Sequence, residues 1–372
     1  MTFCIITHVI HTQQGNQYFG YAPYVNEMNI WIKNANKIII VAPLQKKEVG
    51  AIMQPYAHNN IEFIEVPHFS FTSFKNTLFS LLVIPSICFR IAMAMKKSDH
   101  IHLRCPGNMG LLGSWIQIFF PSKRKTAKYA GNWDANAKQP LSYKIQRRLL
   151  SNTFLTKKMQ VLVYGEWENQ SLNVKPFFTA TYAEEEKTVV EARPLNSTIH
   201  FIFVGTLTSG KRPIYAIQLV ESLHKKGFNV QLDLYGEGKE KSALQNYIQE
   251  NNCHDFITLK GNVARDAIKN IYQKSHFLIL PSQSEGWPKV VAEAMFWGCL
   301  PIATPISCVA NMLDHQKRGL LLALELDTDV RNVEQLINNS DDYKRKINNG
   351  INWSRQFTID KFESEIKKLL QE

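Results

Sequence analysis

Short apolar runs alternate with longer segments of helical period along the whole chain. In the first half, apolar runs predict strands at residues 3–9, 37–42, 61–66, 100–104, 126–130 and 160–164. The segments between these runs predict helices at residues 21–33, 74–96, 110–119 and 141–151. Alternation of this kind is typical of a parallel sheet whose strands are joined by crossover helices.

A polar stretch at residues 182–197 interrupts this pattern and predicts a linker, because it has little apolar periodicity. A second alternation follows it. Its predicted strands lie at residues 199–204, 230–235, 256–259, 277–280 and 300–303, and its predicted helices at residues 213–226, 239–250, 264–274 and 288–297. The tail from residue 330 to residue 370 predicts helix, broken near Gly350. We therefore expect two similar α/β units.

The composition agrees with two folded units. A chain of 372 residues has room for two domains, and 45% hydrophobic with 20% charged residues excludes wholesale disorder. The six cysteines are scattered without metal-site or redox-motif spacing, which fits a reducing cytoplasm. The amino terminus has neither a basic segment nor a cleavage site, so we expect no signal peptide and a cytoplasmic protein.

The charge is strongly basic and uneven. The net charge is +11, and basic residues cluster at residues 123–128 and 144–158. Such a face attracts phosphates, anionic lipids or nucleic acid, although a plain solvated surface is an equally good interpretation. The most apolar long stretch, residues 78–95, contains Pro85 and Arg90. Because about 18 residues is the lower limit for a membrane span, we expect a buried or interfacial helix there.

The segment after residues 277–280 carries the strongest chemical signal. A helix is predicted to begin near Pro288, since proline is favoured in a first helical turn. Free backbone N–H groups at such a helix start bind anions and polyols. Glu285 lies in the preceding turn and Glu293 follows eight residues later, so two carboxylates can accept hydrogen bonds from sugar hydroxyls. Spacing alone leaves a helix-capping glutamate and an unrelated surface glutamate as an alternative.

The whole segment resembles the E-x7-E motif of family-4 glycosyltransferases. The flanks match too, with Pro-Ser, Ser-Glu-Gly, Glu-Ala-Met, Gly and Pro-Ile-Ala in order. The resemblance implies the GT-B fold, an α/β architecture of two Rossmann-like domains that face each other across a cleft. We expect an acceptor-binding domain at residues 1–190 and a nucleotide-sugar-binding domain at residues 191–352. The resemblance also implies that the last helix, at residues 353–372, packs back on the first domain.

The resemblance assigns roles around the two glutamates. Glu285 would lie at the donor sugar and phosphate, and Glu293 would bind the ribose, with Gly286, Trp287 and Lys289 lining the donor site. The family usually has Gly-Phe-Gly after the first glutamate, where backbone N–H groups touch sugar hydroxyls. Here proline follows the tryptophan and has no N–H, so the identity of the sugar stays open.

A second loop, after residues 199–204, resembles the family's Val-Gly-Arg-Leu…Lys-Gly loop, in which an arginine and a lysine neutralise the departing diphosphate. Gly205 ends the strand and Lys211 matches the lysine. Thr206 stands where the arginine usually lies, and Arg212 is the expected replacement.

Two further loops complete the expected donor site. Gly236 and Gly238 resemble the family's Gly-x-Gly loop near the donor. Asn262 and Val263 resemble the loop that contacts the nucleotide base.

The first half carries weaker signals for an acceptor site. Residues 11–20 stand where relatives have a glycine-rich loop, and His11, Gly15 and Asn16 are the expected acceptor-side residues within it. Four further acceptor-side residues are expected at the ends of later strands, at the same edge of the sheet. They are Arg104, Asn108, Asn132 and Asp134.

Together these features predict a retaining glycosyltransferase that moves a hexosyl unit from a nucleotide diphosphate sugar to an acceptor hydroxyl. We expect Glu285 and Lys211 to be the catalytic residues, with no cofactor and no obligatory metal. Expected partners are a nucleotide sugar, a saccharide or lipid-linked acceptor of bacterial-type polysaccharide or glycolipid biosynthesis, and an anionic membrane surface. Nucleic acid is not expected. The alternatives are a sugar-nucleotide epimerase of the same fold and a basic nucleic-acid-binding protein.

Overall fold

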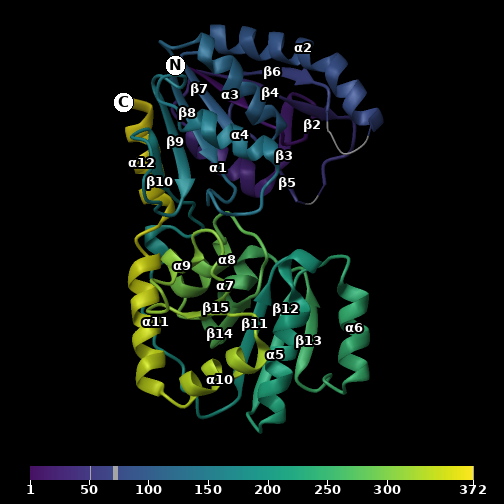
Figure 1. Ribbon diagram of the computed structural model, residues 1–372, viewed down its shortest axis with the longest axis vertical. Helices are drawn as coiled ribbons and strands as arrows, with labels where there is room; N and C mark the ends of the chain where they lie inside the picture. Colours follow the sequence, from purple (N-terminus) through teal and green to yellow (C-terminus); the bar gives the residue numbers. More distant parts are fainter. Residues whose placement is uncertain (51, 70–73, 372) are drawn as a thin grey trace. The chain divides into compact units, whose positions relative to one another are not determined.

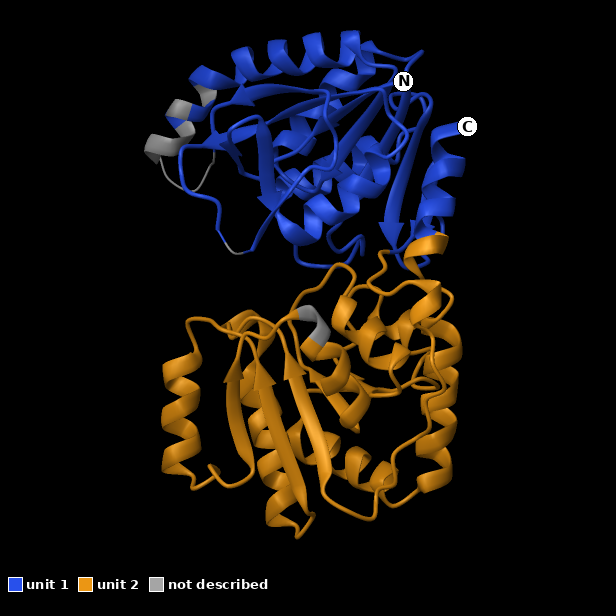
Figure 2. Ribbon diagram, turned by 180° about the vertical axis from the view of Figure 1, so that it is seen from behind, with its two compact units in different colours: residues 1–178, 362–372 blue, residues 179–361 orange. Residues whose placement is uncertain are grey.

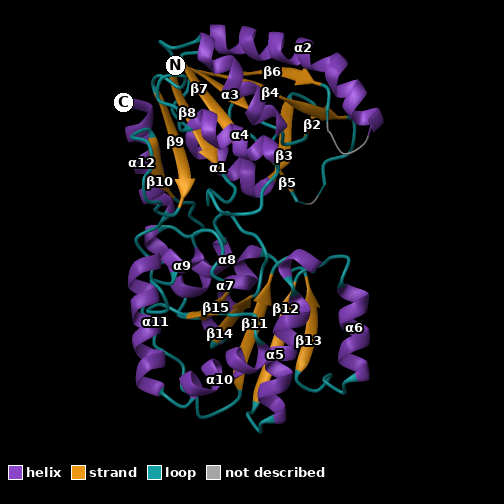
Figure 3. Cartoon of the chain, in the orientation of Figure 1, coloured by secondary structure: helices purple, strands orange, loops and turns teal. Residues whose placement is uncertain are grey.

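The computed structural model describes residues 1–50, 52–69 and 74–371, which form two compact units (Figure 2). The first unit contains Met1–Phe178 and the chain from Phe362 onward, and the second contains Thr179–Lys361. Each unit is a mainly parallel sheet with helices packed against it (Figures 1 and 3). The α/β class predicted from the alternating pattern is therefore confirmed.

Parallel strands of the first unit follow the order β10-β9-β8-β7-β1-β4-β6. Their bounds are Thr2–Ile6 for β1, Lys37–Gln45 for β4, Ile61–Val66 for β6, His100–Cys105 for β7, Arg124–Tyr129 for β8, Met159–Tyr164 for β9 and Val174–Phe177 for β10. The chain's first strand is central, and the winding reverses between β1 and β7. Doubly wound sheets bind ligands at such a switch point, beyond the carboxyl ends of the strands.

The helices of the first unit cover this sheet. They are α1 (Ala22–Ile32), α2 (Phe74–Lys97), α3 (Asn108–Ile116) with the short η1 (Gln117–Phe119), and α4 (Leu141–Leu150). Helix α2 buries Ile87, Ile91 and Met95, which recur every four residues and so lie on one helix face. Helix α3 packs against both α2 and α4, so these three helices form one layer.

The segment after β1 differs from the prediction. The expected glycine-rich loop at residues 11–20 is a β-hairpin, so that prediction is wrong. Strand β2 (His11–Gln14) pairs antiparallel with β3 (Gln17–Tyr21), and β3 pairs with β5 (Met53–Pro55). Gly15 and Asn16 form the two-residue turn, where Gly15 has φ 58°. Hairpin turns of this length need positive φ, which explains the glycine without any ligand.

The second unit is a parallel sheet in the order β13-β12-β11-β14-β15-β16. Its strands are β11 (Ile199–Val204), β12 (Val230–Tyr235), β13 (Ile257–Gly261), β14 (Phe277–Leu280), β15 (Leu300–Ala303) and β16 (Leu320–Leu321). In chain order this is 3-2-1-4-5-6, the Rossmann arrangement, with the switch point between β11 and β14. Its position decides where a ligand site is expected.

The helices of the second unit join these strands. They are η2 (Glu184–Glu186), η3 (Ser209–Lys211), α5 (Pro213–Lys225), α6 (Lys241–Glu250), α7 (Arg265–Lys274), α8 (Lys289–Phe296), α9 (Val309–Met312), α10 (Leu326–Ile337) and α11 (Ser340–Ser354). The predicted helix break near Gly350 is wrong, because this residue lies buried inside α11. A Cβ there would lie 3.2 Å from Met295 Cγ, so the glycine permits close packing of α11 on α8.

The two units divide after Phe178, whereas the sequence predicted a boundary at residue 190. The polar stretch at residues 182–197 belongs to the second unit. Arg193 holds it there by donating hydrogen bonds of 2.7–3.1 Å to four backbone carbonyls of that unit. The polar composition predicted a linker, but the hydrogen bonds of the Arg193 guanidinium hold the segment against the second unit.

The final helix, α12 (Ile359–Gln371), joins the first unit from Phe362 onward. The Phe362 ring contacts Phe177 and Phe178, with ring centroids 5.4 Å and 5.7 Å apart. The sequence expected the returning segment to begin at residue 353, but residues 353 and 354 still belong to α11. Glu372 lies outside the described residues.

Within the described ranges, no helix is both long enough and apolar enough to cross a membrane. The longest one, α2, contains Pro85 and has two different faces. One face is buried on the sheet, while Leu82 and Phe89 on the other are 74% and 68% exposed.

Candidate functional site

The strand order of the second unit brings the loops after β11 and β14 together. These strands are hydrogen-bonded neighbours although they lie far apart in the sequence. Gln283 N donates to Gly210 O at 2.8 Å, which joins the two loops. Lys211 from the first loop donates to Glu285 from the second and forms an ion pair with it. The switch point therefore unites the two residues that the sequence predicted to be catalytic.

This ion pair is shielded but still reachable. The Lys211 side chain is 28% exposed and the Glu285 side chain 11% exposed. Partial burial strengthens the attraction between the charges relative to a surface pair. The remaining exposure leaves the ammonium open to a second anion.

Glycines let the loops after β11 and β12 approach closely. A Cβ on Gly236 would lie 1.9 Å from Gly205 O, and a Cβ on Gly238 would lie 2.2 Å from Leu207 O. No other residue fits at either position. Leu207 N donates to Glu237 O at 3.0 Å, so the two loops also share backbone hydrogen bonds. Three of the residues predicted at the donor site, Gly205, Gly236 and Gly238, thus shape the backbone there.

The loop after β13 is joined by a backbone hydrogen bond to the loop after β12. Gly236 N donates to Gly261 O at 2.9 Å. Gly261 has φ 71°, and the predicted base-contacting residues Asn262 and Val263 follow it with exposed side chains. This loop therefore presents both predicted residues to solvent at the carboxyl end of the sheet.

Arg212 has an unusual backbone for a residue with a side chain. Its φ is 50°, in the left-handed region, and it forms the N-cap of α5. Such a conformation costs about 1 kcal/mol for a residue other than glycine. Its guanidinium donates a long hydrogen bond of 3.5 Å to Pro281 O, at the end of β14. Thr206, where relatives have an arginine, is exposed.

The turn after Glu285 is held by neighbours within the second unit. Gly286 O accepts hydrogen bonds from Ser307 Oγ at 3.0 Å and Cys308 Sγ at 3.2 Å. Burial raises the pKa of Cys308 to about 12, so the thiol keeps its proton and remains a donor. These two hydrogen bonds hold the Gly286 carbonyl in place, directly after Glu285 of the ion pair.

Trp287, one of the departures from the family pattern, packs on an aromatic cluster. Its ring stacks against Trp353 of α11 at 6.0 Å between centroids and meets Phe357 edge-on at 5.6 Å. The sequence placed Trp287 in the donor site and missed this anchoring role. No local signal reveals it, because the partner rings lie far along the chain.

Glu293 lies in α8, which begins at Lys289. Its carboxylate accepts from Thr181 Oγ1 at 2.7 Å and from Tyr272 OH at 3.2 Å. Burial, reinforced by the charge of Glu293, raises the pKa of Tyr272 well above its usual value, so this hydroxyl stays a donor. Both donors were missed from the sequence, and together they orient the carboxylate.

In the first unit, His11 is part of the core. Its ring is buried, and its Nε2 lies 2.9 Å from Tyr56 Oη. Burial lowers the pKa of His11 to about 4, so the ring is neutral near pH 7. Gly15 and Asn16 lie in the exposed hairpin turn, apart from His11. The structure therefore does not bring these three predicted acceptor-side residues together.

His8 lies instead at the switch point of the first unit. It follows β1 and is exposed, while Gly107 follows the neighbouring strand β7. A Cβ on Gly107 would lie 2.8 Å from His8 Nδ1, so the glycine makes room for the imidazole. Arg104 at the end of β7 is held by Glu27, with 3.7 Å between Nη1 and Oε1. The sequence did not single out His8, because a lone histidine is as consistent with a structural role as with a functional one.

The other predicted acceptor-side residues shape local structure. Asn108 begins α3 and donates to Phe69 O at 3.4 Å. Asn132 and Asp134 accept hydrogen bonds of 2.9 Å from backbone N–H groups two residues further on. Such turns fix the loop after β8.

A metal site needs several ligating side chains close together. No group of three His, Cys, Asp or Glu side chains that could hold a metal occurs among residues 1–50, 52–69 and 74–371.

The family model described as glycosyl transferases group 1 matches residues 185–353. The matched residues include the Lys211–Glu285 pair, the glycine-bearing loops and α8. Most of the second unit therefore matches the group 1 glycosyltransferase family, and we call this unit the glycosyltransferase domain. Its switch point is the candidate donor site.

Two curated relatives each match a little under half of the chain. An uncharacterised glycosyltransferase of Methanocaldococcus jannaschii is 28% identical over 172 residues, which cover 46% of this chain and 47% of the relative. An uncharacterised glycosyltransferase of Haemophilus influenzae is 30% identical over 179 residues, covering 47% of this chain and 49% of the relative. The chain thus spans about half the length of these relatives.

Solved structures extend the likeness beyond the glycosyltransferase domain. The Anabaena protein HepE, determined in complex with UDP-glucose, matches with a TM-score of 0.67 at 12% identity. The match covers 100% of this chain and 99% of that one. At this identity the likeness shows the fold, which is GT-B with two Rossmann-like domains, as the sequence predicted.

Proposed function

We propose that this protein transfers a hexosyl unit from a nucleotide diphosphate sugar to an acceptor hydroxyl, with retention of anomeric configuration. The observation that carries the proposal is the Lys211–Glu285 pair at the switch point of a group 1 glycosyltransferase domain. The relative in the solved complex binds UDP-glucose, which makes UDP-sugars the first donors to test.

Cationic groups of the second unit stabilise the leaving diphosphate in this proposal. Lys211 and Arg212 follow β11 and approach the end of β14, and the backbone N–H groups at the start of α8 lie beyond the same strand. Charge on the departing phosphate grows in the transition state, so fixed cations there lower the barrier. Neither a metal nor a cofactor is part of the proposed reaction.

The two glutamates bind different parts of the donor. Glu285 is oriented by Lys211, and its carboxylate accepts a hydrogen bond from a hydroxyl of the transferred sugar. Glu293 is oriented by Thr181 and Tyr272 and accepts from the ribose hydroxyls. In the front-face mechanism implied by the family resemblance, the leaving phosphate helps to take the acceptor proton, so no covalent nucleophile is required.

The acceptor is proposed to be a saccharide or a lipid-linked saccharide of polysaccharide or glycolipid biosynthesis. His8 and Gly107 at the switch point of the first unit are the residues proposed to receive it. The six cysteines are free thiols, as expected in a reducing cytoplasm, which is the proposed compartment.

The epimerase alternative is not favoured, because the matching family and both curated relatives are described as glycosyltransferases. Product analysis distinguishes them: a transferase consumes the donor only with an acceptor, whereas an epimerase converts the nucleotide sugar alone.

The proposal is tested by a thermal-shift screen with nucleotide sugars. A ligand at a hundred times its Kd stabilises the folded state by about 2.7 kcal/mol, which is measurable as a rise in Tm. A shift with one diphosphate sugar identifies the donor. The absence of a shift with every diphosphate nucleotide would contradict the proposed function.

Variants then test the site. Glu285→Ala and Lys211→Ala should each lower transfer at least about tenfold with the fold intact, because each removes charge or orientation at the reacting centre. Lys226→Ala is the matched control, since it breaks the Lys226–Glu334 ion pair of 2.6 Å at the other end of α5. Wild-type turnover in both site variants would refute the assignment.

A further inference from the structure

Large apolar side chains are exposed unevenly over the molecule. Of the fifteen that are exposed in the described part of the chain, nine lie between residues 78 and 154, and only two lie in the glycosyltransferase domain. Single exposed apolar residues are normal on soluble proteins, but a concentration of them on neighbouring elements marks an interaction surface. These nine residues come from α2, α3, η1, α4 and the segment after α4.

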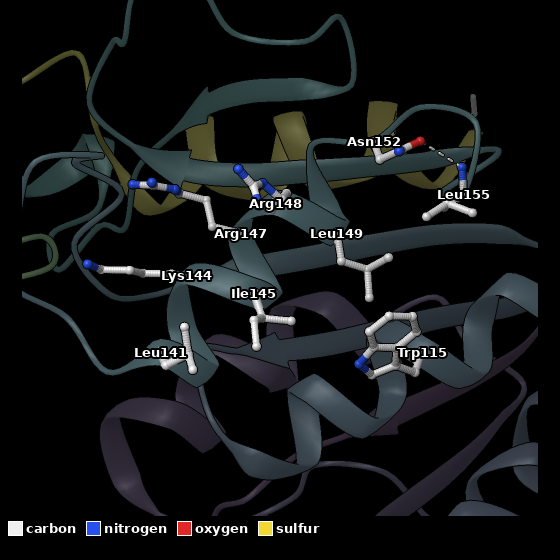
Figure 4. A pocket seen from close by; sticks show the side chains of 9 residues that line it. All are labelled: Trp115, Leu141, Lys144, Ile145, Arg147, Arg148, Leu149, Asn152 and Leu155. Atoms are coloured by element: carbon white, nitrogen blue, oxygen red, sulfur yellow. Dashed lines mark hydrogen bonds between the residues drawn. The ribbon is translucent and has the colours of Figure 1, made fainter.

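The surface contains a pocket between α3 and α4. Its volume is about 480 Å³, and its apolar lining includes Trp115 and Ile145, which are 49% and 40% exposed. Lys144, Arg147 and Arg148 of α4 line the same pocket. Figure 4 shows the charged ends of Lys144 and Arg147 on one side and the Trp115 and Leu155 side chains on the other. The pocket is therefore amphipathic, because cationic and apolar side chains line it together.

The stretch of sequence that carries α3 and α4 is strongly basic, although Lys125 and Lys128 within it are buried. Between Asp99 and Glu166 the sequence has eleven lysines and arginines but only one acidic residue, Asp134. Helix α4 has no acidic residue, and its Leu141 is 72% exposed. After α4, the Lys157 ammonium lies 5.3 Å from the ring centre of Phe154, which is 76% exposed. Basic and apolar side chains thus alternate over one surface.

We propose that the outer face of α3 and α4, with the segment that follows α4, docks on a bilayer containing anionic phospholipids. Lipid phosphates pair with Lys144 and Arg148, while Trp115, Leu141 and Ile145 enter the boundary between head groups and acyl chains. Interfacial helices bind membranes by this combination of apolar area and cationic charge. A solvated basic face would need no exposed tryptophan, leucine and phenylalanine among its charges.

The test is co-sedimentation with vesicles. The full chain should bind vesicles of phosphatidylcholine with phosphatidylglycerol, and bind poorly to phosphatidylcholine alone. Lys144→Gln/Arg148→Gln should weaken the partition coefficient about thirtyfold, the equivalent of about 1 kcal/mol for each cation near an anionic surface. Leu141→Ser/Ile145→Ser should weaken it about tenfold, because both side chains are exposed and their removal costs membrane contact rather than core packing.

A control variant separates a defined surface from net charge. Lys274→Gln/Lys344→Gln removes the same charge from exposed positions of the glycosyltransferase domain and should bind as the wild type does. Equal weakening in this control, or no binding to anionic vesicles, would overturn the proposal. Vesicle binding that requires a polyprenyl phosphate would also overturn the proposal. The same holds if Lys144→Gln/Arg148→Gln loses binding to duplex DNA but keeps binding to vesicles.

Membrane docking and the proposed transfer reaction involve different units of the chain, so separate measurements test them. The four residues substituted in the docking variants belong to the first unit, whereas the Lys211–Glu285 pair belongs to the second. Thermal shifts with the nucleotide sugar should therefore be unchanged in the docking variants. If the protein binds vesicles but no nucleotide sugar, the docking surface is supported and the proposed function is contradicted.

Discussion

Gly236→Ala tests whether the close approach of two loops builds the donor site. The added Cβ would lie 1.9 Å from Gly205 O, whereas real Cβ atoms stay at least 3.0 Å from such atoms. One of the two backbones must therefore move by the difference, 3.0 − 1.9 = 1.1 Å. The residue also has φ 146°, a backbone region that side chains disfavour. A movement of about 1 Å at a reacting centre costs on the order of a hundredfold in rate.

We expect Gly236→Ala to lower kcat/KM for the donor about a hundredfold and the free energy of unfolding by about 2–4 kcal/mol. Steady-state kinetics with a varied donor gives the first value, and urea unfolding gives the second. Circular dichroism establishes whether the variant is folded under the assay conditions.

Two other glycines of the same unit serve as controls. Gly210 has no positive φ and nothing within 4 Å of an added Cβ, so Gly210→Ala should be close to neutral. Gly227 has φ 90° but equally open space, so Gly227→Ala should report backbone strain alone, with normal turnover. Turnover of Gly236→Ala within twofold of wild type would refute the idea that this loop contact positions the donor.

Three further predictions concern the anchoring residues. Arg193→Met should lower the free energy of unfolding by about 3 kcal/mol in urea, because four carbonyls lose a charged donor, and Arg193→Lys should recover less than half of that loss. Burial lowers the pKa of His11 from 6.5 to about 4, so the neutral ring's contribution to stability is complete above pH 6.5 and is lost as the pH falls towards 4. The free energy of unfolding of the wild type should therefore fall between pH 7 and pH 5. The same fall should be about 2 kcal/mol smaller in His11→Gln, which has no titrating ring. Trp287→Leu and Trp353→Leu should both raise the KM for the donor several-fold, because each removes one ring of the same stack; a changed KM in only one of them would contradict the anchoring role.

Much of the fold was predictable from the sequence because each strand and helix carries its own pattern. The strands at residues 61–66, 199–204, 230–235, 277–280 and 300–303 lie where the apolar runs predicted them. The hairpin after β1 was missed, since its strands are short and partly exposed, and they gain stability only by pairing with β4 and β5. The helix break predicted near Gly350 was wrong for a similar reason. This glycine lets α11 pack closely on Met295, and no local pattern shows that contact.

The sequence by itself determined most of the strands and helices, the α/β class and the motif residues of the expected donor site, because periodicity and strand-end chemistry are local properties. Only the tertiary structure decided which of those residues meet. The strand order placed β11 beside β14 and joined Lys211 to Glu285, while burial withdrew His11 into the core and left His8 at the switch point. Neighbours across a sheet are set by the packing of whole crossover units, so their identity cannot be derived from any single stretch of chain.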